Sequence, residues 1–314
     1  MIEFITRRLA QTLVVLVIVS FIAFSLIQIT PGDPALVILG DSATPAQVEA
    51  LRHELGLDQP VWVQYLRWAS NIVHGDLGKS ISLDESVTSL LAARLPVTFQ
   101  LGLFALLLST LASIPLGIIC AVRRGGWLDS LISASANLAM AVPIFWLGIL
   151  GIYVFSLKLG WLPVQGYTSP FDNLALNSRQ ILMPVICLAV IPLASLARQT
   201  RSSMLEVIRQ DYIRTARSKG LRRTEVIVGH ALKNAIIPVI TLLGMQLRTL
   251  VGGAVLVETV FNIPGMGRLL VTGVFNKDYV LVQGVVMVVA LVVALGNLAV
   301  DISYGYFDPR IRYD

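Results

Sequence analysis

The feature that most constrains this chain is a set of six apolar stretches, each long enough to cross a lipid bilayer. A helix needs about 20 consecutive apolar residues to span the hydrocarbon core. The stretches cover residues 9–29, 98–121, 131–157, 180–197, 236–257 and 280–300. Hydrophobic residues make up 55% of the chain and charged residues only 14%, a balance that no soluble domain of this length needs. The sequence therefore predicts an all-α integral membrane protein with six transmembrane helices.

Two of the stretches carry further structural information. The fourth is the shortest and contains Pro184 and Pro192, which leaves its ends open. In the second stretch, residues four positions apart form a helical face made mostly of small side chains, and small residues allow close contact between membrane helices. This face consists of Leu101, Ala105, Ser109, Ser113 and Gly117.

The positions of the basic residues predict the orientation, because cytoplasmic loops carry an excess of Lys and Arg. With six crossings, one set of flanking basic residues falls on a single side. The set is Arg7, Arg8, Arg123, Arg124, Arg198, Arg201, Arg209, Arg214, Arg217, Lys219, Arg222, Arg223, Lys233, Arg310 and Arg312. We therefore expect both termini in the cytoplasm and the segment 31–96 outside. The net charge of +5 reflects this bias, so we expect lipid and not nucleic acid around the chain.

The chain is expected to divide into three parts, 1–95, 96–303 and 304–314. The first holds one membrane helix and a long extracytoplasmic segment, the second the other five helices, and the third a cytoplasmic tail. Thr44-Pro45 predicts the start of a helix in the extracytoplasmic segment. The aromatic residues Trp62, Tyr65 and Trp68 are typical of an interfacial belt, or alternatively of the packing of a small cap.

The sequence carries no convincing nucleotide-binding motif. Gly78-Lys79-Ser80 resembles the end of a phosphate-binding loop, but that loop requires a glycine where Val73 stands. Cys120 and Cys187 both lie in apolar stretches, and the histidines lack metal-ligand spacing. We therefore expect no catalytic, cofactor-binding or metal-binding residues in this chain. The energy for any active transport must come from a partner or from an ion gradient.

Arg248 is the only charged residue well inside an apolar stretch, and it shares a helical face with Gly244 and Gly252. It can line a translocation path and attract a carboxylate, or it can be paired within the bundle or reach an interface. A carrier driven by an ion gradient usually has more ionisable groups near mid-membrane. A secondary carrier and a membrane scaffold without transport activity are the alternatives to an ATP-driven transporter.

A basic segment, residues 206–235, separates the fourth and fifth apolar stretches. Its pattern predicts a helix, a turn at Gly220 and a second helix of about residues 223–235. Gly220 suits a backbone position with positive φ or close approach, or the simple stop of a helix. A helix–turn–helix along the membrane can transmit a push as a rigid lever, which a flexible loop cannot.

Several short motifs, in a fixed order along nearly the whole chain, resemble those of one protein family. They are Thr30-Pro-Gly-Asp-Pro34, Leu55-Gly-Leu-Asp-Gln-Pro-Val-Trp-Val-Gln-Tyr65, Gly75-Asp-Leu-Gly78, Arg214-Thr-Ala-Arg-Ser-Lys-Gly220-Leu, His230-Ala-Leu-Lys-Asn-Ala-Ile-Ile-Pro238, Glu258-Thr-Val-Phe261, Pro264-Gly-Met-Gly-Arg268, Asp278-Tyr279 and Phe307-Asp-Pro-Arg-Ile311. Together they resemble the first of the two permease subunits in the dipeptide, oligopeptide and nickel group of bacterial ABC importers.

The resemblance implies the six-helix fold of a type I ABC importer permease in the bacterial inner membrane, with its core at 96–303. It also implies the partners of this chain. They are a second homologous permease subunit, two ATP-binding subunits that use the ATP, an extracytoplasmic solute-binding protein and the lipid bilayer. The expected cargo is peptide, with nickel or glutathione as alternatives.

The same resemblance makes 206–235 the loop that couples the membrane subunit to its ATPase. The residues carried over to this loop are Arg214, Thr215, Ala216, Gly220, Leu221 and Pro238. Arg214 stands where the wider importer pattern has a Glu, and the spacing from Gly220 to Pro238 is longer than usual. An acidic contact from that position to the ATPase is therefore in doubt.

Overall fold

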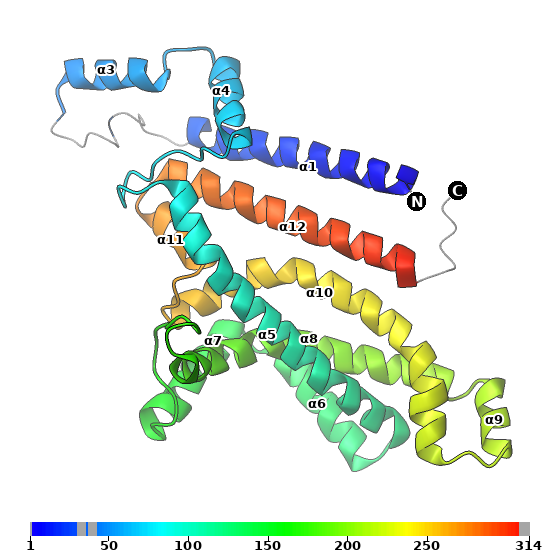
Figure 1. Ribbon diagram of the computed structural model, residues 1–314. Coiled ribbons are helices and arrows are strands. Elements are labelled where there is room, and N and C mark those ends of the chain that lie inside the picture. The colour runs from blue at the N-terminus through cyan, green and yellow to red at the C-terminus, as the bar shows by residue number, and fades with distance from the viewer. Residues whose placement is uncertain (1, 30–35, 37–42, 308–314) are drawn as a thin grey trace. The chain divides into compact units, whose positions relative to one another are not determined.

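The computed structural model describes residues 2–29, 36 and 43–307, most of them in helices, and this confirms the all-α prediction (Figure 1). The α-helices are α1 (Ile2–Ile29), α3 (Pro45–Leu55), α4 (Val61–Val73), α5 (Val87–Val122), α6 (Trp127–Ala141), α7 (Ile144–Gly151), α8 (Leu174–Val207), α9 (Asp211–Ser218), α10 (Leu232–Val260), α11 (Met266–Phe275) and α12 (Tyr279–Phe307). Two π-helical segments, η1 (Ile152–Lys158) and η2 (Glu225–Ala231), continue α7 and precede α10.

Among the described residues, five helices are long and apolar enough to cross a membrane. They are Thr6–Ser25, Val87–Val122, Leu174–Val207, Glu225–Gln246 and Tyr279–Asp301. The pair formed by Trp127–Ala141 and Ile144–Lys158 supplies a sixth crossing if the bent pair is counted as one. Counted in this way, the described chain has the six crossings that its apolar stretches predict.

The chain divides into two compact units. The first contains residues 97–267 and the end of α12 from Gly296, and the second contains residues 2–96 and 268–295. Helices α5 and α12 therefore contribute to both units. The boundaries expected from the sequence, at 95/96 and 303/304, stay predictions.

Helix α8 is the centre of the first unit. It packs against α6, α7 and α10, and it is the most buried of the membrane-spanning helices described (Figure 1). Its apolar face joins a cluster with α5 and the end of α10. The fully or nearly buried members of this cluster are Val97, Leu101, Ala105, Ile181, Met183, Val185, Cys187, Leu188, Ala189, Val257, Phe261 and Ile263.

The predicted small-residue face of α5 is buried along its whole length, from Leu101 to Gly117. At its end the backbones of α5 and α8 come close together. A Cβ on Gly117 would lie 2.5 Å from the Thr200 Cβ and 2.7 Å from the Ala197 carbonyl oxygen. Only a glycine fits this contact without a shift of one helix, so the face acts in packing as predicted.

The second unit joins α1 to α3 and α4. Thr44 caps α3 with a reciprocal hydrogen-bond pair, which confirms the predicted helix start. On α4, the Tyr65 hydroxyl lies 2.8 Å from the Ser20 hydroxyl of α1, and its ring contacts Phe21 and Phe24. Within this unit Tyr65 therefore packs against α1, as the small-cap interpretation expects.

The third predicted span, 131–157, is wrong as a single helix. Helix α6 ends at Ala141, and the chain turns by 103° before α7 and η1. Val142 is extended because a residue before proline avoids the helical conformation, and Pro143 has no N–H to continue the hydrogen-bond ladder.

The fourth predicted span, 180–197, is too short. Helix α8 has 34 residues and runs through Pro184 and Pro192, which are both buried in it. A proline leaves a backbone carbonyl of the preceding turn without its N–H donor. In a membrane helix, neighbouring helices can satisfy this freed group, so proline is tolerated there. As a result, Arg198 and Arg201 belong to α8 and not to the loop that follows it.

The fifth predicted span and the helix expected at 223–235 also differ from the structure. Residues 225–260 form one continuous helical run, η2 followed by α10, so the expected second helix is the first part of the fifth span. Helix α11 was not predicted, since at 10 residues it is too short to register as a span.

Candidate functional site

The candidate site is the segment 206–235, which we call the coupling segment, at the end of α8. Helix α9 within it is amphipathic: Ile213 and Ala216 are buried, whereas Arg214 and Arg217 are exposed. Residues three and four apart lie on one face of a helix, so the spacing of Ile213 and Ala216 explains why this basic sequence still packs as a helix.

A hydrophobic cluster attaches the coupling segment to three membrane-spanning helices. Its buried members come from α5, α8, α9, η2 and α10, and all of them lie in the first unit. They are Ala121, Met204, Ile213, Ala216, Val226, Ala231 and Ala235. Helix α9 is therefore packed in one cluster with α5, α8 and α10, and close-packed interiors transmit strain.

Polar contacts hold the turn between α9 and η2. The Asn234 side-chain amide donates to the Tyr212 hydroxyl at 2.7 Å, which ties α10 to α9. The backbone N–H of Arg222 donates to the Glu225 carboxylate at 3.0 Å and satisfies one group at the start of the following helix. These contacts hold α9, the turn and the following helix in a defined arrangement.

Gly220 ends the α9 turn with a φ of +80°, which confirms the prediction of positive φ. Its N–H donates to the Arg217 carbonyl at 3.0 Å. No heavy atom lies within 4 Å of the place where a Cβ would stand. The glycine is therefore required for its backbone conformation and not for close approach.

The six residues carried over to this segment differ in exposure and in position. Arg214, Thr215, Gly220 and Leu221 are exposed, so they can contact a partner. Ala216 is buried in the hydrophobic cluster and can act only through packing. Pro238 lies inside α10, beyond the segment.

Arg248 belongs to α10, but its side chain lies outside the described residues. Its place in a translocation path therefore stays a prediction.

A second polar centre, which sequence reasoning did not assign, joins α5, α10 and the start of α11. Glu258 is fully buried. The Thr98 hydroxyl donates to its Oε1 at 2.5 Å and accepts from the Met266 N–H at 2.8 Å. Gly265 packs against the same carboxylate, so the motifs at Glu258–Phe261 and Pro264–Arg268 are two halves of one contact. The signal in the sequence was an acidic residue at the end of an apolar stretch, a few residues before Gly-Met-Gly.

The fold identifies the class of protein. An inward-facing structure of the MetNI methionine ABC transporter has a chain that matches with a TM-score of 0.57 at 18% identity, over 70% of this chain and 96% of that one. A crystal structure of an amino acid ABC transporter with histidines matches with a TM-score of 0.51 at 16% identity, over 71% and 95%. The fold is therefore that of a type I ABC importer permease.

The sequence comparison identifies the family. The model for the binding-protein-dependent transport system inner membrane component matches residues 113–313, and the model for the N-terminal part of these membrane components matches residues 1–102. The chain belongs to this family.

Individual relatives match over their full length. A putative peptide transport system permease protein of Brucella abortus (strain 2308) is 43% identical over 310 residues, 99% of each chain. The dipeptide transport system permease protein DppB of Escherichia coli (strain K12) is 39% identical over 337 residues, 100% of this chain and 99% of that one.

Proposed function

We propose that this chain is the permease subunit of an ABC importer that forms the path for peptides across the inner membrane. The observation that carries the proposal is the full-length identity of about 40% to permeases named for peptide and dipeptide transport. These matches cover 99% and 100% of the chain, so they include both the core and the extracytoplasmic segment. The cargo is proposed to be peptide rather than nickel or glutathione for the same reason.

The proposed partners are a second homologous permease, two ATP-binding subunits that hydrolyse the ATP, and an extracytoplasmic solute-binding protein. The coupling segment is proposed to contact an ATP-binding subunit in the cytoplasm. Its exposed residues combine basic and apolar side chains, a mixture that suits a protein interface better than lipid headgroups alone. They include Tyr212, Arg214, Arg217, Lys219, Leu221, Arg222, Arg223 and Val228.

The mechanism follows from the hydrophobic cluster. Closure of the ATP-binding subunits would displace α9, and the cluster would carry that displacement to α5, α8 and α10 as one body. Because a packed core moves between discrete arrangements, such a push favours switching between inward-open and outward-open states over gradual deformation. Access to the path would thus alternate between the two sides of the membrane.

Growth on peptides tests the proposed cargo. A strain that requires an amino acid, and that lacks this chain and other peptide importers, should fail to grow when the amino acid is supplied as a di- or oligopeptide. The wild-type gene should restore growth. Normal growth on peptides, together with loss of a nickel-dependent enzyme activity, would assign nickel as the cargo instead.

Copurification and energetics distinguish the alternatives to an ABC importer. The tagged chain should copurify an ATPase, and uptake should stop on ATP depletion but continue with an uncoupler. Uptake that the uncoupler abolishes would indicate a secondary carrier, and a deletion without any uptake defect would indicate a scaffold.

Arg248 is proposed to line the path and to attract the carboxylate of the cargo. Arg248→Gln should then leave the amount of assembled protein unchanged and slow the uptake of peptides. Loss of the protein from the membrane would show that Arg248 has a structural partner instead.

A further inference from the structure

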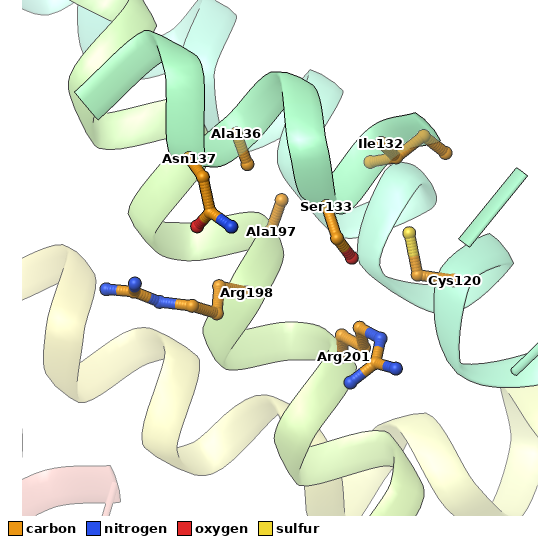
Figure 2. A pocket seen from close by; sticks show the side chains of 8 residues that line it. All are labelled: Cys120, Ile132, Ser133, Ala136, Asn137, Ala197, Arg198 and Arg201. Carbon is orange, nitrogen blue, oxygen red and sulfur yellow. The ribbon is translucent and has the colours of Figure 1, made fainter. Parts of the chain in front are cut away.

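A cavity of about 160 Å³ opens between α5, α6 and α8, outside the coupling segment. Its lining residues are Cys120, Ile132, Ser133, Ala136, Asn137, Ala197, Arg198 and Arg201. Figure 2 shows Asn137 and Ser133 on one side of the cavity and the two arginines on the other. All of these residues belong to the first unit.

The charge of Arg201 is already compensated. Its Nε donates to Asp129 Oδ1 at 2.6 Å and its Nη2 to Asp129 Oδ2 at 2.8 Å. The Gly125 N–H donates to the same carboxylate at 3.0 Å, and Asp129 is nearly fully buried. This bidentate ion pair joins α6 to α8 and holds the two helices together at one wall of the cavity.

Arg198 stands one helical turn before Arg201 on the same face of α8 and has no such counter-charge. Among the described residues, neither the Arg198 guanidinium nor the Asn137 amide has a hydrogen-bond or ion-pair partner, and both are exposed. The cavity therefore carries a net positive charge with several free N–H donors. Arg123 and Arg124, exposed in the turn between α5 and α6, add to the positive potential at this end of the helices.

The depth of the cavity follows from helix geometry. At about 1.5 Å per residue, the 34 residues of α8 span about 51 Å, about 20 Å more than the hydrocarbon core. If the helix is centred, about 10 Å emerges at each end. Arg198 lies nine residues before Val207, about 14 Å from the helix end, and the guanidinium can reach further outward. The donors therefore lie near the boundary where lipid phosphates stand.

We propose that this cavity binds the phosphate of an anionic membrane lipid, in the leaflet at the end of α8 that leads into the coupling segment. A guanidinium and an amide supply donors to phosphate oxygens, and basic pockets between membrane helices are suited to such headgroups. The faces that line the cavity continue into apolar surface that fits acyl chains. Met140 lies one turn after Ala136 on α6, Ile191 lies two turns before Arg198 on α8, and they are 41% and 38% exposed. A water-filled path for peptides would need a polar face there. The lipid would brace α6 against α8, whatever the cargo of the transporter.

The test uses the full-length chain in nanodiscs of phosphatidylcholine, with and without a minority of phosphatidylglycerol that has the same acyl chains. Phosphatidylglycerol should raise the Tm of the wild type by about 2–4 °C, the change expected from one good polar contact in a chain of this size. Arg198→Gln should lose most of this rise, and Asn137→Leu part of it. Arg198→Lys, which keeps the charge, should retain most of it.

Arg217→Gln is the matched control, because it removes an exposed arginine from α9 without touching the cavity. It should show the full rise. An equal rise in Arg198→Gln, or no rise in the wild type, would overturn the proposal. Inorganic phosphate and a dipeptide, each added to pure phosphatidylcholine discs, distinguish the sources of the anion. A rise with either one, without a further effect of phosphatidylglycerol, would make the cavity a site for soluble anions and would also overturn it.

Discussion

At the scale of single residues, Gly220 offers a test of the coupling segment that does not disturb its packing. A φ of +80° costs other residues about 1–3 kcal/mol, whereas open space around the position removes any steric clash. We expect Gly220→Val to reach the membrane in normal amounts, to lose peptide uptake and to copurify less ATPase. Asparagine tolerates this backbone region, so Gly220→Asn should keep both properties.

Gly229 provides the control for this prediction. It lies in η2, also has open space around it and does not have a positive φ. Gly229→Val should therefore transport at the wild-type rate. Normal transport by Gly220→Val, or an equal defect in both variants, would show that the backbone conformation at Gly220 is not what coupling requires.

Thr98 is the residue on which the second polar centre depends. Thr98→Val keeps the shape of the side chain, but it removes one hydrogen bond from the buried Glu258 carboxylate and the acceptor of the Met266 N–H. The buried Met266 N–H then lacks its acceptor, and such a loss costs about 1–3 kcal/mol. We expect a lower Tm for the purified subunit in detergent.

The same substitution at Thr259 serves as the reference for Thr98→Val. Thr259 is exposed on α10, and its hydroxyl bonds the Val255 carbonyl within the same helix. The Tm of Thr259→Val should stay close to that of the wild type. If the two variants melt together, the Thr98 contact does not stabilise the fold.

At the scale of helices, the sequence predicted which segments cross the membrane but not where each helix begins and ends. Hydrophobicity marks the part of a helix that lies in lipid, and it says nothing of polar turns that extend beyond it. The run from Glu225 to Val260 shows this, because the apolar stretch at 236–257 marks only its later part. Hydrophobicity also cannot distinguish Pro143, which ends a helix, from Pro184, which is packed inside one. The neighbours of each proline decide the outcome, and they are known only from the fold.

The start of α12 illustrates a polar contact that stabilises a helix in the second unit. Asp278 is fully buried there and accepts hydrogen bonds from the Ser80 hydroxyl at 2.6 Å, from the Ser82 N–H and hydroxyl at 2.9 Å each, and from the Leu281 N–H at 3.1 Å. Burial by itself raises the pKa of Asp278, but these hydrogen bonds outweigh it and hold the pKa below its usual range. The charged carboxylate therefore stabilises the folded state.

The pH dependence of stability tests this contact. Because the pKa is lower in the folded state, the contribution is fully present above the unfolded-state pKa of about 4 and is lost as pH falls below it, through the folded pKa. The Tm difference between wild type and Asp278→Asn should be largest near neutral pH and should shrink below about pH 4. Asp172→Asn, at an exposed carboxylate, should show little difference at any pH. A constant difference for Asp278→Asn would contradict the assignment.

At the scale of the whole molecule, the motifs of the coupling segment could be predicted, but not how the segment is held. Ala216 is a small residue in a basic sequence, and nothing in its neighbours along the chain shows that it packs against α5, α8 and α10. The cavity beside Arg198 was hidden for a related reason, since its walls come from residues about 80 positions apart. Periodicity shows the faces of a helix, and only the assembled fold shows which faces meet.

The orientation of the molecule is the remaining whole-chain prediction, and two cysteine substitutions test it. The bias of basic residues places α4 on the extracytoplasmic side of the membrane and α9 in the cytoplasm. Ser70 and Ser218 are exposed on these two helices, and the native Cys120 and Cys187 are buried and should give little background. A thiol reagent that does not cross the membrane should label Ser70→Cys in intact cells and Ser218→Cys only after the cells are permeabilised. Labelling of Ser218→Cys in intact cells would invert the orientation, and it would also remove the coupling segment from any cytoplasmic ATPase.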